Sequence, residues 1–319
     1  MQNLIFLVND EPYCLWGFDL PKRNDEFLRG LDAGYFEYCL NAHLATEDEQ
    51  RASVALRTTL HHALETLFSL LGAYVQAPDC PYAWIAKCST SDLREFVQRV
   101  SRSDPNIFTK LNISSASWPL VAEAIFATYL PGSDKQKRTV ACFSKVWSYL
   151  AQDFQNANYI DEYNSLKHGF RVKRGGFSLA IGKEPSYGVP PPDGEMHLMG
   201  KSDFGTSFFK IESIGSNKKN RSIRAHRTSV NWSPERDILS LQLAYMSLNN
   251  VISALRIVNG WPAPECAFIR PENDDDFDKP WQYTPSVMSI NFDHVVDEQN
   301  TVLVTKKELL EKVYGDSES

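Results

Sequence analysis

The chain has 319 residues, of which 43% are hydrophobic and 23% charged, and its formal net charge at pH 7 is −7. This composition is ordinary for a soluble globular protein and excludes a chain too polar to build a core. No apolar run approaches membrane-spanning length, so we expect no membrane association. Residues 1–10 contain a short apolar run without a basic flank or a cleavage site, which predicts a buried strand rather than a signal peptide.

The six cysteines are scattered, without a CxxC pair and without a histidine at ligand spacing. They are Cys14, Cys39, Cys80, Cys88, Cys142 and Cys266. This pattern argues against a disulfide framework and against a zinc site, and we expect a reducing, cytoplasmic location. The common nucleotide-binding and hydrolase motifs are also missing, so we expect no metal and no other cofactor.

Charge is unevenly distributed along the chain. Residues 171–230 contain eleven Lys and Arg against five Asp and Glu, whereas residues 271–300 contain eight acids against Lys279 alone. The basic middle could therefore face a polyanion, or it could face the acidic tail of the same chain.

The first half of the sequence predicts helices. Residues 24–43 suggest a short helix, although Gly30 and Gly34 weaken it. Thr46 and Glu49 have the spacing of a capping box, and the apolar row that follows runs to residue 74. Further helices are expected over 90–103, 117–130, 133–154 and 157–168.

After Gly169 the pattern changes to period two. Residues 177–182, 206–215 and 221–232 predict strands, with a Pro- and Gly-rich loop over 183–205. Ser233 and Pro234 then start a helix that is apolar nearly all round and should be buried. An acidic loop over 272–296 leads to a possible strand, and residues 305–315 predict a final short helix.

These elements predict an α+β fold that is mainly α: a helical bundle with a small antiparallel sheet and a long buried helix in the C-terminal half. We expect residues 1–169 to form the bundle. Residues 170–319 should hold the sheet, the long helix and the acidic tail, packed on the bundle as one body.

The stretch 157–177 places Asn164 and His168 four apart, so both flank one side of a helix. A structural explanation is available, because cations suit the end of a helix and Gly169 suits a left-handed cap. The long helix over "LHHALETLFSLLGAYVQAP" followed by this Asn and His nevertheless resembles the HEPN superfamily of all-α domains over roughly residues 46–170. That resemblance implies a metal-independent ribonuclease, or an inactive RNA-binding or dimerising module, in toxin and phage-defence systems.

The hallmark of that family is an Arg closely followed by a His. Arg57 and His62 have this spacing, with Thr58 at the polar position after the Arg, whereas no Arg stands at that distance before His168. The resemblance implies that His62 or His168 acts as general acid or base on a ribose 2′-hydroxyl, while Arg57 stabilises the phosphorane. The structural alternative is that Arg57, His61 and Glu65 form a charge ladder on a half-exposed helix face.

A second candidate site is the basic segment of the sheet. Arg224 and His226 should point to one face of their strand, with Ile223 and Ala225 on the other. The full set of candidate phosphate contacts is Arg171, Lys173, Arg174, Lys218, Lys219, Arg221, Arg224, His226 and Arg227. An edge strand protected by charge is the structural alternative.

We therefore predict an RNA-binding protein. Its catalytic version is a HEPN-type endoribonuclease of a toxin or phage-defence system, in which Arg57, His62, Asn164 and His168 converge. The alternative is a non-catalytic interaction or dimerisation module whose partner is a protein or a second copy. A third hypothesis is a small-molecule enzyme with the loop 183–205 as its lid.

Overall fold

The computed structural model describes residues 3–17, 19–214, 222–292 and 304–315. Contacts divide the chain into two units, unit 1 (Met1–Tyr163 and Trp232–Thr284) and unit 2 (Asn164–Asn231 and Pro285–Ser319). Helices predominate and the sheets are small and antiparallel, which confirms the predicted mainly helical α+β class.

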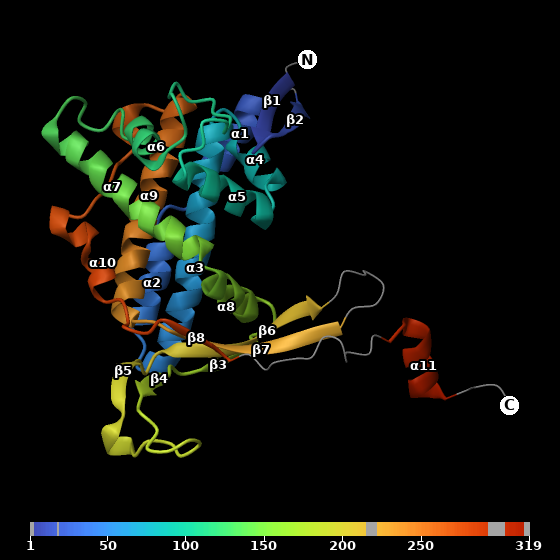
Figure 1. Cartoon of the computed structure of the whole chain (residues 1–319). Helices are drawn as coiled ribbons and strands as arrows, with labels where there is room; N and C mark the ends of the chain where they lie inside the picture. Colours follow the sequence, from blue (N-terminus) through green and yellow to red (C-terminus); the bar gives the residue numbers. More distant parts are fainter. Residues whose placement is uncertain (1–2, 18, 215–221, 293–303, 316–319) are drawn as a thin grey trace. The chain divides into compact units, whose positions relative to one another are not determined.

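Unit 1 is built from helices and one hairpin (Figure 1). The hairpin pairs β1 (Asn3–Val8) with β2 (Glu11–Trp16), and it buries Phe6 and Val8 as expected for a strand at the start of the chain. The helices are α1 (Leu20–Gly30), α2 (Tyr35–Leu44), α3 (Glu49–Gln76), α4 (Pro81–Lys87), α5 (Thr90–Ser101), α6 (Trp118–Ile125), α7 (Asp134–Gln155), α9 (Pro234–Val258) and α10 (Lys279–Gln282). Helix α8 (Ala157–Lys167) ends the first segment of unit 1 and continues into unit 2.

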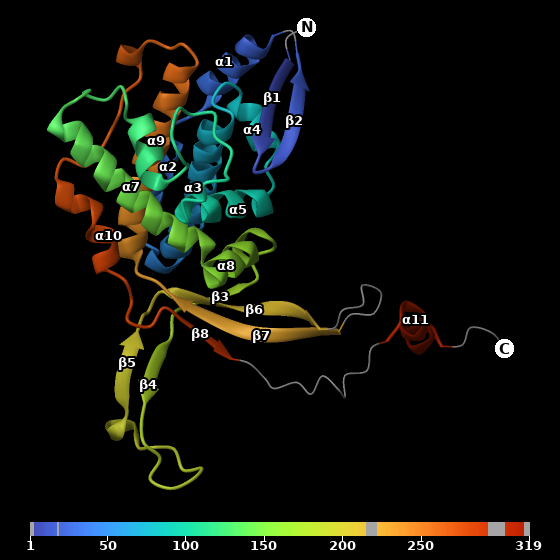
Figure 2. The same ribbon diagram turned by 45° about the horizontal axis from the view of Figure 1, so that its top comes forward.

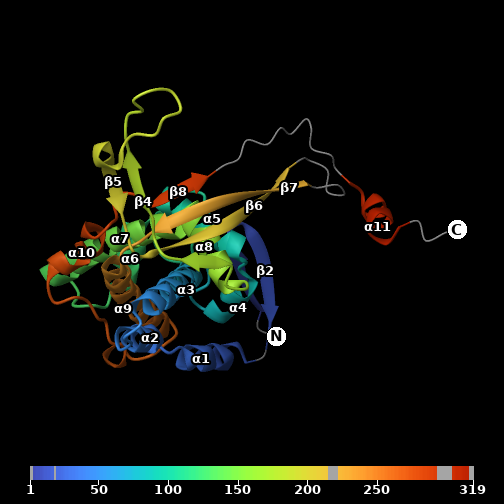
Figure 3. The same ribbon diagram turned by 90° about the horizontal axis from the view of Figure 1, so that it is seen from below.

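Helices α3 and α9 form the centre of the core and lie side by side in Figures 1 and 3. Helix α3 buries the predicted row Leu60, Leu64, Leu67 and Leu71. Helix α9 starts as predicted, with the Ser233 hydroxyl accepting the Arg236 N–H and Pro234 in the first turn. It is long and apolar enough to span a membrane, so the expectation that no apolar run approaches that length is wrong; 67% of the apolar window is buried in the structure, as in a core helix.

Two predicted helix starts differ in the structure. Helix α3 begins at Glu49, and its N-cap is Asp48, whose carboxylate accepts the Arg51 N–H; the capping box at Thr46 is therefore wrong. The single helix expected over 24–43 is two helices, α1 and α2. Between them the Asp32 carboxylate accepts the Gly34 N–H, which favours a turn over a continuous helix.

Unit 2 contains a four-stranded antiparallel sheet in the order β3-β6-β7-β8 (Figure 2). Its strands are β3 (Val172–Arg174), β6 (Gly205–Ile214), β7 (Ser222–Asn231) and β8 (Ser289–Phe292). A separate hairpin pairs β4 (Ser178–Ile181) with β5 (His197–Lys201), and α11 (Lys306–Tyr314) lies near the end of the chain. Strands β3 and β5 lie in segments that the sequence did not mark as strands.

The sheet has two unlike faces. One carries Phe208, His226, Thr228 and Val230, all of which are buried. The opposite face carries Phe209, Ile211, Ile223 and Phe292, whose side chains are 67%, 57%, 66% and 52% exposed. We call this second surface the open face of the sheet.

The predicted division at residue 169 differs from the observed one. Unit 2 interrupts unit 1 from Asn164, within α8, to Asn231, and the chain returns to the helical unit with Trp232. The physical reason is the apolar surface of α9, which packs against α3, α2 and α7 within unit 1. The packing of both halves as one body stays a prediction.

Candidate functional site

Arg57 of α3 is a buried structural cation. Its side chain is only 4% exposed, and its Nε donates to Glu162 Oε2 at 3.1 Å while its Nη1 donates to Asp237 Oδ1 at 3.0 Å. The guanidinium also lies over the Tyr159 ring, 4.4 Å from the centroid. Arg57 thus joins α3, α8 and α9 within unit 1.

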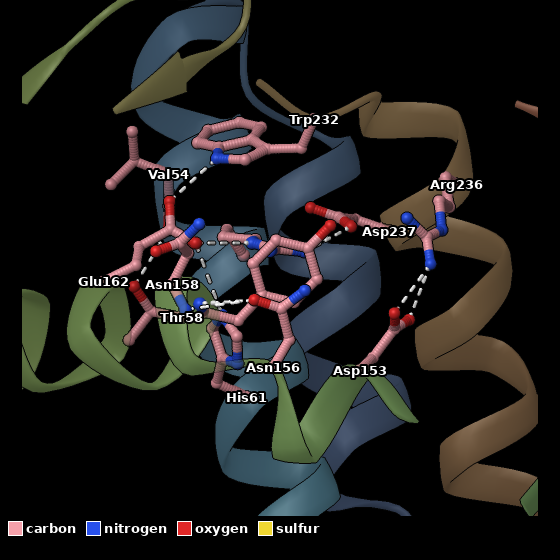
Figure 4. A network of polar contacts seen from close by, with 12 residues as sticks. Val54, Thr58, His61, Asp153, Asn156, Asn158, Glu162, Trp232, Arg236 and Asp237 are labelled. Atoms are coloured by element: carbon pink, nitrogen blue, oxygen red, sulfur yellow. Dashed lines mark hydrogen bonds and ion pairs between the residues drawn. The ribbon is translucent and has the colours of Figure 1, made fainter. Parts of the chain in front are cut away.

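Glu162 completes this buried group from α8. Its side chain is fully buried, and its Oε1 accepts the indole N–H of Trp232 at 2.8 Å (Figure 4). Both carboxylate oxygens are therefore used, one by an ion pair and one by a neutral donor. The hydrogen-bonding capacity of this buried carboxylate is met by these partners, and the carboxylate holds Arg57 and Trp232 in place.

A second ion pair continues the network between α7 and α9. Arg236 Nη2 donates to both oxygens of Asp153, at 2.9 and 2.7 Å, as Figure 4 shows. Burial raises the pKa of the adjacent Asp237 to about 6, against the opposing effect of Arg57 and Arg236. For Arg57, burial acts to lower the pKa, but Asp237 and Glu162 outweigh it and the pKa lies above its ordinary value.

His61 lies one turn after Arg57 and faces the same carboxylate. Its Nε2 is 3.6 Å from Glu162 Oε2, and its ring stacks on Tyr163 with centroids 5.2 Å apart. Burial, and then the Arg57 charge, lower the pKa of His61, so the imidazole is neutral near pH 7. One turn further, Glu65 accepts the Tyr163 hydroxyl at 3.2 Å.

Arg57, His61 and Glu65 therefore share one face of α3, as the ladder interpretation requires. The expected half-exposure of that face is wrong for Arg57 and His61, which are buried against α8. The reason is Glu162: a fully buried acid on α8 supplies the counter-charge that lets a guanidinium leave water.

His62 is not placed with Arg57. Five residues along a helix turn the side chain to another face, and His62 is exposed, with its ring edge-on to Phe36 at a centroid distance of 5.2 Å. The structure thus brings Arg57 to Glu162 and Asp237, and the convergence of Arg57 with His62 is wrong.

Asn164 and His168 belong to unit 2, at the end of α8. Asn164 is half-buried and His168 is exposed, and the His168 N–H donates to the Asn164 carbonyl as in an ordinary helix end. Gly169 has φ of +97°, which confirms the left-handed conformation expected for it. Their catalytic role stays a prediction.

The predicted basic segment divides between the two faces of the sheet. Arg224 and His226 share a face as expected, but Arg224 and the nearly buried His226 Nε2 both contact the Glu212 carboxylate, at 3.3 and 3.1 Å. Arg224, and then His226, hold the pKa of Glu212 below its usual value. This part of the basic face is neutralised within the sheet.

Other members of the basic segment remain exposed. Arg171, Lys173 and Arg174 are exposed at and beside β3, and Arg227 is exposed on the open face. Lys218, Lys219 and Arg221 lie outside the described residues. Within the described segments of the chain, Arg171, Lys173, Arg174 and Arg227 form no ion pair.

Arg227 occupies the middle of a row that crosses three strands. It pairs with Phe209 of β6 on one side and with Phe292 of β8 on the other. Directly opposed residues in antiparallel strands have Cβ atoms roughly 5 Å apart, so Arg227 holds the position between two exposed aromatic residues in this row. This row was not predicted, although Phe209 lies on the exposed side of the alternating pattern in residues 206–215.

Among the described residues, no group of three or more His, Cys, Asp or Glu side chains is placed to hold a metal ion. No family model matches the chain, and no curated protein and no solved structure shows significant similarity to it.

Proposed function

We propose that this protein binds single-stranded RNA through the open face of the sheet. The observation that carries the proposal is the row Phe209–Arg227–Phe292, in which two exposed aromatic rings flank one exposed cation. Unstacked bases bind proteins by stacking on aromatic rings and on guanidinium planes, while Lys and Arg contact the phosphates. A row of this composition supplies both interactions.

Basic groups near the row support the same proposal. Lys173 of β3 pairs with Ser207, which lies on the open face one row from Phe209. Arg171 and Arg174 are exposed close to the same strand. A strand of RNA crossing the sheet from β8 to β3 could therefore contact Arg227 and Lys173 in succession.

The test is a binding titration of the full chain with a fluorescently labelled, unstructured oligoribonucleotide. We expect Phe209→Ala and Phe292→Ala each to weaken binding by about 1–3 kcal/mol, the usual contribution of one stacked base. Tyr187→Ala is the matched control, because Tyr187 is a fully exposed aromatic residue of unit 2 outside the four-stranded sheet.

Two results would reject the proposal. One is that the parent protein does not bind the oligonucleotide. The other is that it binds equally well after both phenylalanines are replaced. A duplex of the same sequence should bind less well, because paired bases cannot stack on the sheet.

Cleavage by a HEPN-like mechanism is a separate proposal. Arg57 is not placed to stabilise a phosphorane, because its buried guanidinium is paired with the Glu162 and Asp237 carboxylates. His168 and His62 are both exposed, so solvent and a ribose can reach their side chains. Incubation of RNA without divalent ions tests the point: loss of cleavage in His168→Ala or His62→Ala would support a nuclease, and an inactive parent would remove it.

The hairpin of β4 and β5 favours the second candidate function, an interaction module. Ile181, Leu198 and Met199 are 56%, 56% and 45% exposed on it, which is unusual for so short a pair of strands. Salt separates the two functions. RNA binding should weaken steeply between low and moderate salt, whereas a protein adaptor would show no RNA affinity to lose.

A further inference from the structure

Helix α11 carries an apolar stripe that no described part of the chain covers. Leu309 and Val313, and Leu310 and Tyr314, are each four residues apart and therefore lie on one side of the helix. Their side chains are 52%, 65%, 43% and 75% exposed, and the helix buries none of its residues. Lys307, Glu308, Glu311 and Lys312 occupy the opposite side, and Lys306 lies in the first turn at the start of the apolar side.

The helix is well defined by its own sequence. Thr305 and Glu308 form a complete capping box, with the Thr305 hydroxyl accepting the Glu308 N–H and the Glu308 carboxylate accepting the Thr305 N–H. A helix of nine residues is nevertheless marginal in water, and helices of this length gain most of their stability from packing an apolar side. An amphipathic stripe of this kind therefore predicts a surface on which α11 docks.

The open face of the sheet matches this helix in length and character. From Arg227 to Ile223, the exposed strip on β7 and β6 covers four residue steps, or about 13 Å. The nine residues of α11 span about 14 Å. Ile211 and Ile223 extend the apolar surface beyond Phe209 and Phe292. RNA bases stack on aromatic rings and guanidinium planes, so these aliphatic side chains are not explained by RNA binding.

The connection between the two is short enough to hold them together. Phe292 ends β8 on the open face, and only 13 residues separate it from Lys306. Thirteen residues reach at most about 45 Å, which is ample for the helix to return to the strip. Because the helix and the strip belong to one chain, the helix has a high local concentration at the strip, so a weak contact within one chain outcompetes the same contact between copies.

We propose that α11 docks on the open face of its own chain and competes there with RNA. The docked helix covers Phe209 and Phe292 with Leu309, Leu310, Val313 and Tyr314. RNA then binds only the fraction of molecules in which the helix has left the strip. The competition rests on the proposed function, whereas the docking itself does not.

Docking is tested by disulfide trapping in the full chain. Ile211→Cys combined with Val313→Cys should form an intramolecular disulfide under mild oxidation. Ile211→Cys combined with Lys312→Cys is the matched control, because Lys312 lies on the polar side of α11 and both pairs keep the same native cysteines. Disulfide-linked monomer in the first pair alone supports docking. Equal trapping in both pairs, or a disulfide-linked dimer, overturns it.

The competition is tested by RNA titration. Leu309→Glu with Val313→Glu should tighten RNA binding a few-fold, because apparent affinity rises with the fraction of open molecules. Lys312→Glu changes the net charge by the same two units on the polar side and should weaken binding slightly or not at all. No gain in the double variant overturns the competition. Loss of RNA binding in every form, with trapping intact, would instead reject the proposed function.

Discussion

Arg57 Nε and Glu162 Oε2 lie 3.1 Å apart although 105 residues separate them in the chain, and both side chains are almost completely removed from water. The sequence suggests a catalytic role for Arg57, whereas in the structure this arginine connects α3 to α8 and α9. The energetic value of the ion pair depends on both partners, because an ion buried without its counter-ion costs far more than the pair contributes.

Replacing Arg57 by Met should therefore destabilise the protein strongly. The substitution leaves the Glu162 and Asp237 carboxylates buried without their cation, and we expect a loss of about 3–5 kcal/mol in the free energy of unfolding. Urea denaturation followed by circular dichroism measures it. His62→Ala on the exposed side of the same helix is the control and should change stability by about 0.5 kcal/mol or less. A loss below about 1 kcal/mol for Arg57→Met would contradict the structural role.

Asp237 should make the stability of unit 1 fall as pH rises through the acidic range. Its pKa is raised from an ordinary value of 3.8 to about 6, so between these values the folded state binds a proton that the unfolded state has released. The stabilisation is complete below pH 3.8 and is lost as pH rises through about 6. The groups facing it are Arg57, Arg236, Glu162 and Asp153.

The measurement compares Asp237→Asn with the parent, each unfolded at several pH values between about 4 and 7. The parent should lose stability relative to the variant as pH rises across this window. His61, whose pKa is lowered, titrates in the opposite sense, but it is present in both proteins and largely cancels in the difference. A difference that does not vary with pH would contradict the raised pKa.

Gly72 should not tolerate even a methyl group. A Cβ atom at this position in α3 would stand 2.2 Å from the Trp84 ring, which is fully buried and cannot move aside. We expect Gly72→Ala to cost about 1–3 kcal/mol by overpacking, despite the better helix propensity of alanine. Thermal unfolding checks this. Gly30→Ala, where a Cβ would meet nothing within 4 Å, should be neutral or slightly stabilising.

Arg227 should contribute to the salt dependence of RNA binding. If one phosphate is neutralised by this side chain, Arg227→Ala should lower the slope of log K against log salt by about 0.7. Arg29, which is exposed but paired with Asp25 in α1, provides a charge-matched control, and Arg29→Ala should leave the slope unchanged. Equal slopes for the parent and Arg227→Ala would remove Arg227 from the RNA contacts.

Much of the helical part could be predicted from local signals. Ser233 with Pro234 marked the start of α9, and Ser133 marked that of α7, because a capping hydroxyl acts within one turn of its own position. Strands β3 and β5 could not be predicted in the same way. Val172–Arg174 is a strand because β6 offers it hydrogen bonds, which is information carried by another segment.

The candidate site was less predictable than the fold. Helix spacing correctly placed Arg57 and His61 on one face, but it could not show that Glu162 and Asp237, 105 and 180 residues away, would meet Arg57 there. One feature of the sequence indicated this arrangement. Glu162 lies three residues after Tyr159 on the apolar side of its helix, and a carboxylate buried there requires a hydrogen-bonding or charged partner. Asp237 offered a similar signal inside a helix that is apolar nearly all round.

Because unit 2 is inserted into unit 1 from Asn164 to Asn231, the two segments of unit 1 are synthesised at different times. A ribosome that has released residues up to Tyr163 has supplied Arg57 and Glu162 but not Asp237, Trp232 or any of α9. Until roughly seventy further residues have been made, the apolar surface of α3 lacks its contacts with α9, and Arg57 lacks its ion pair with Asp237. The exposed apolar surface of the incomplete helical unit favours aggregation. We therefore expect fragments that stop before Trp232 to aggregate rather than fold.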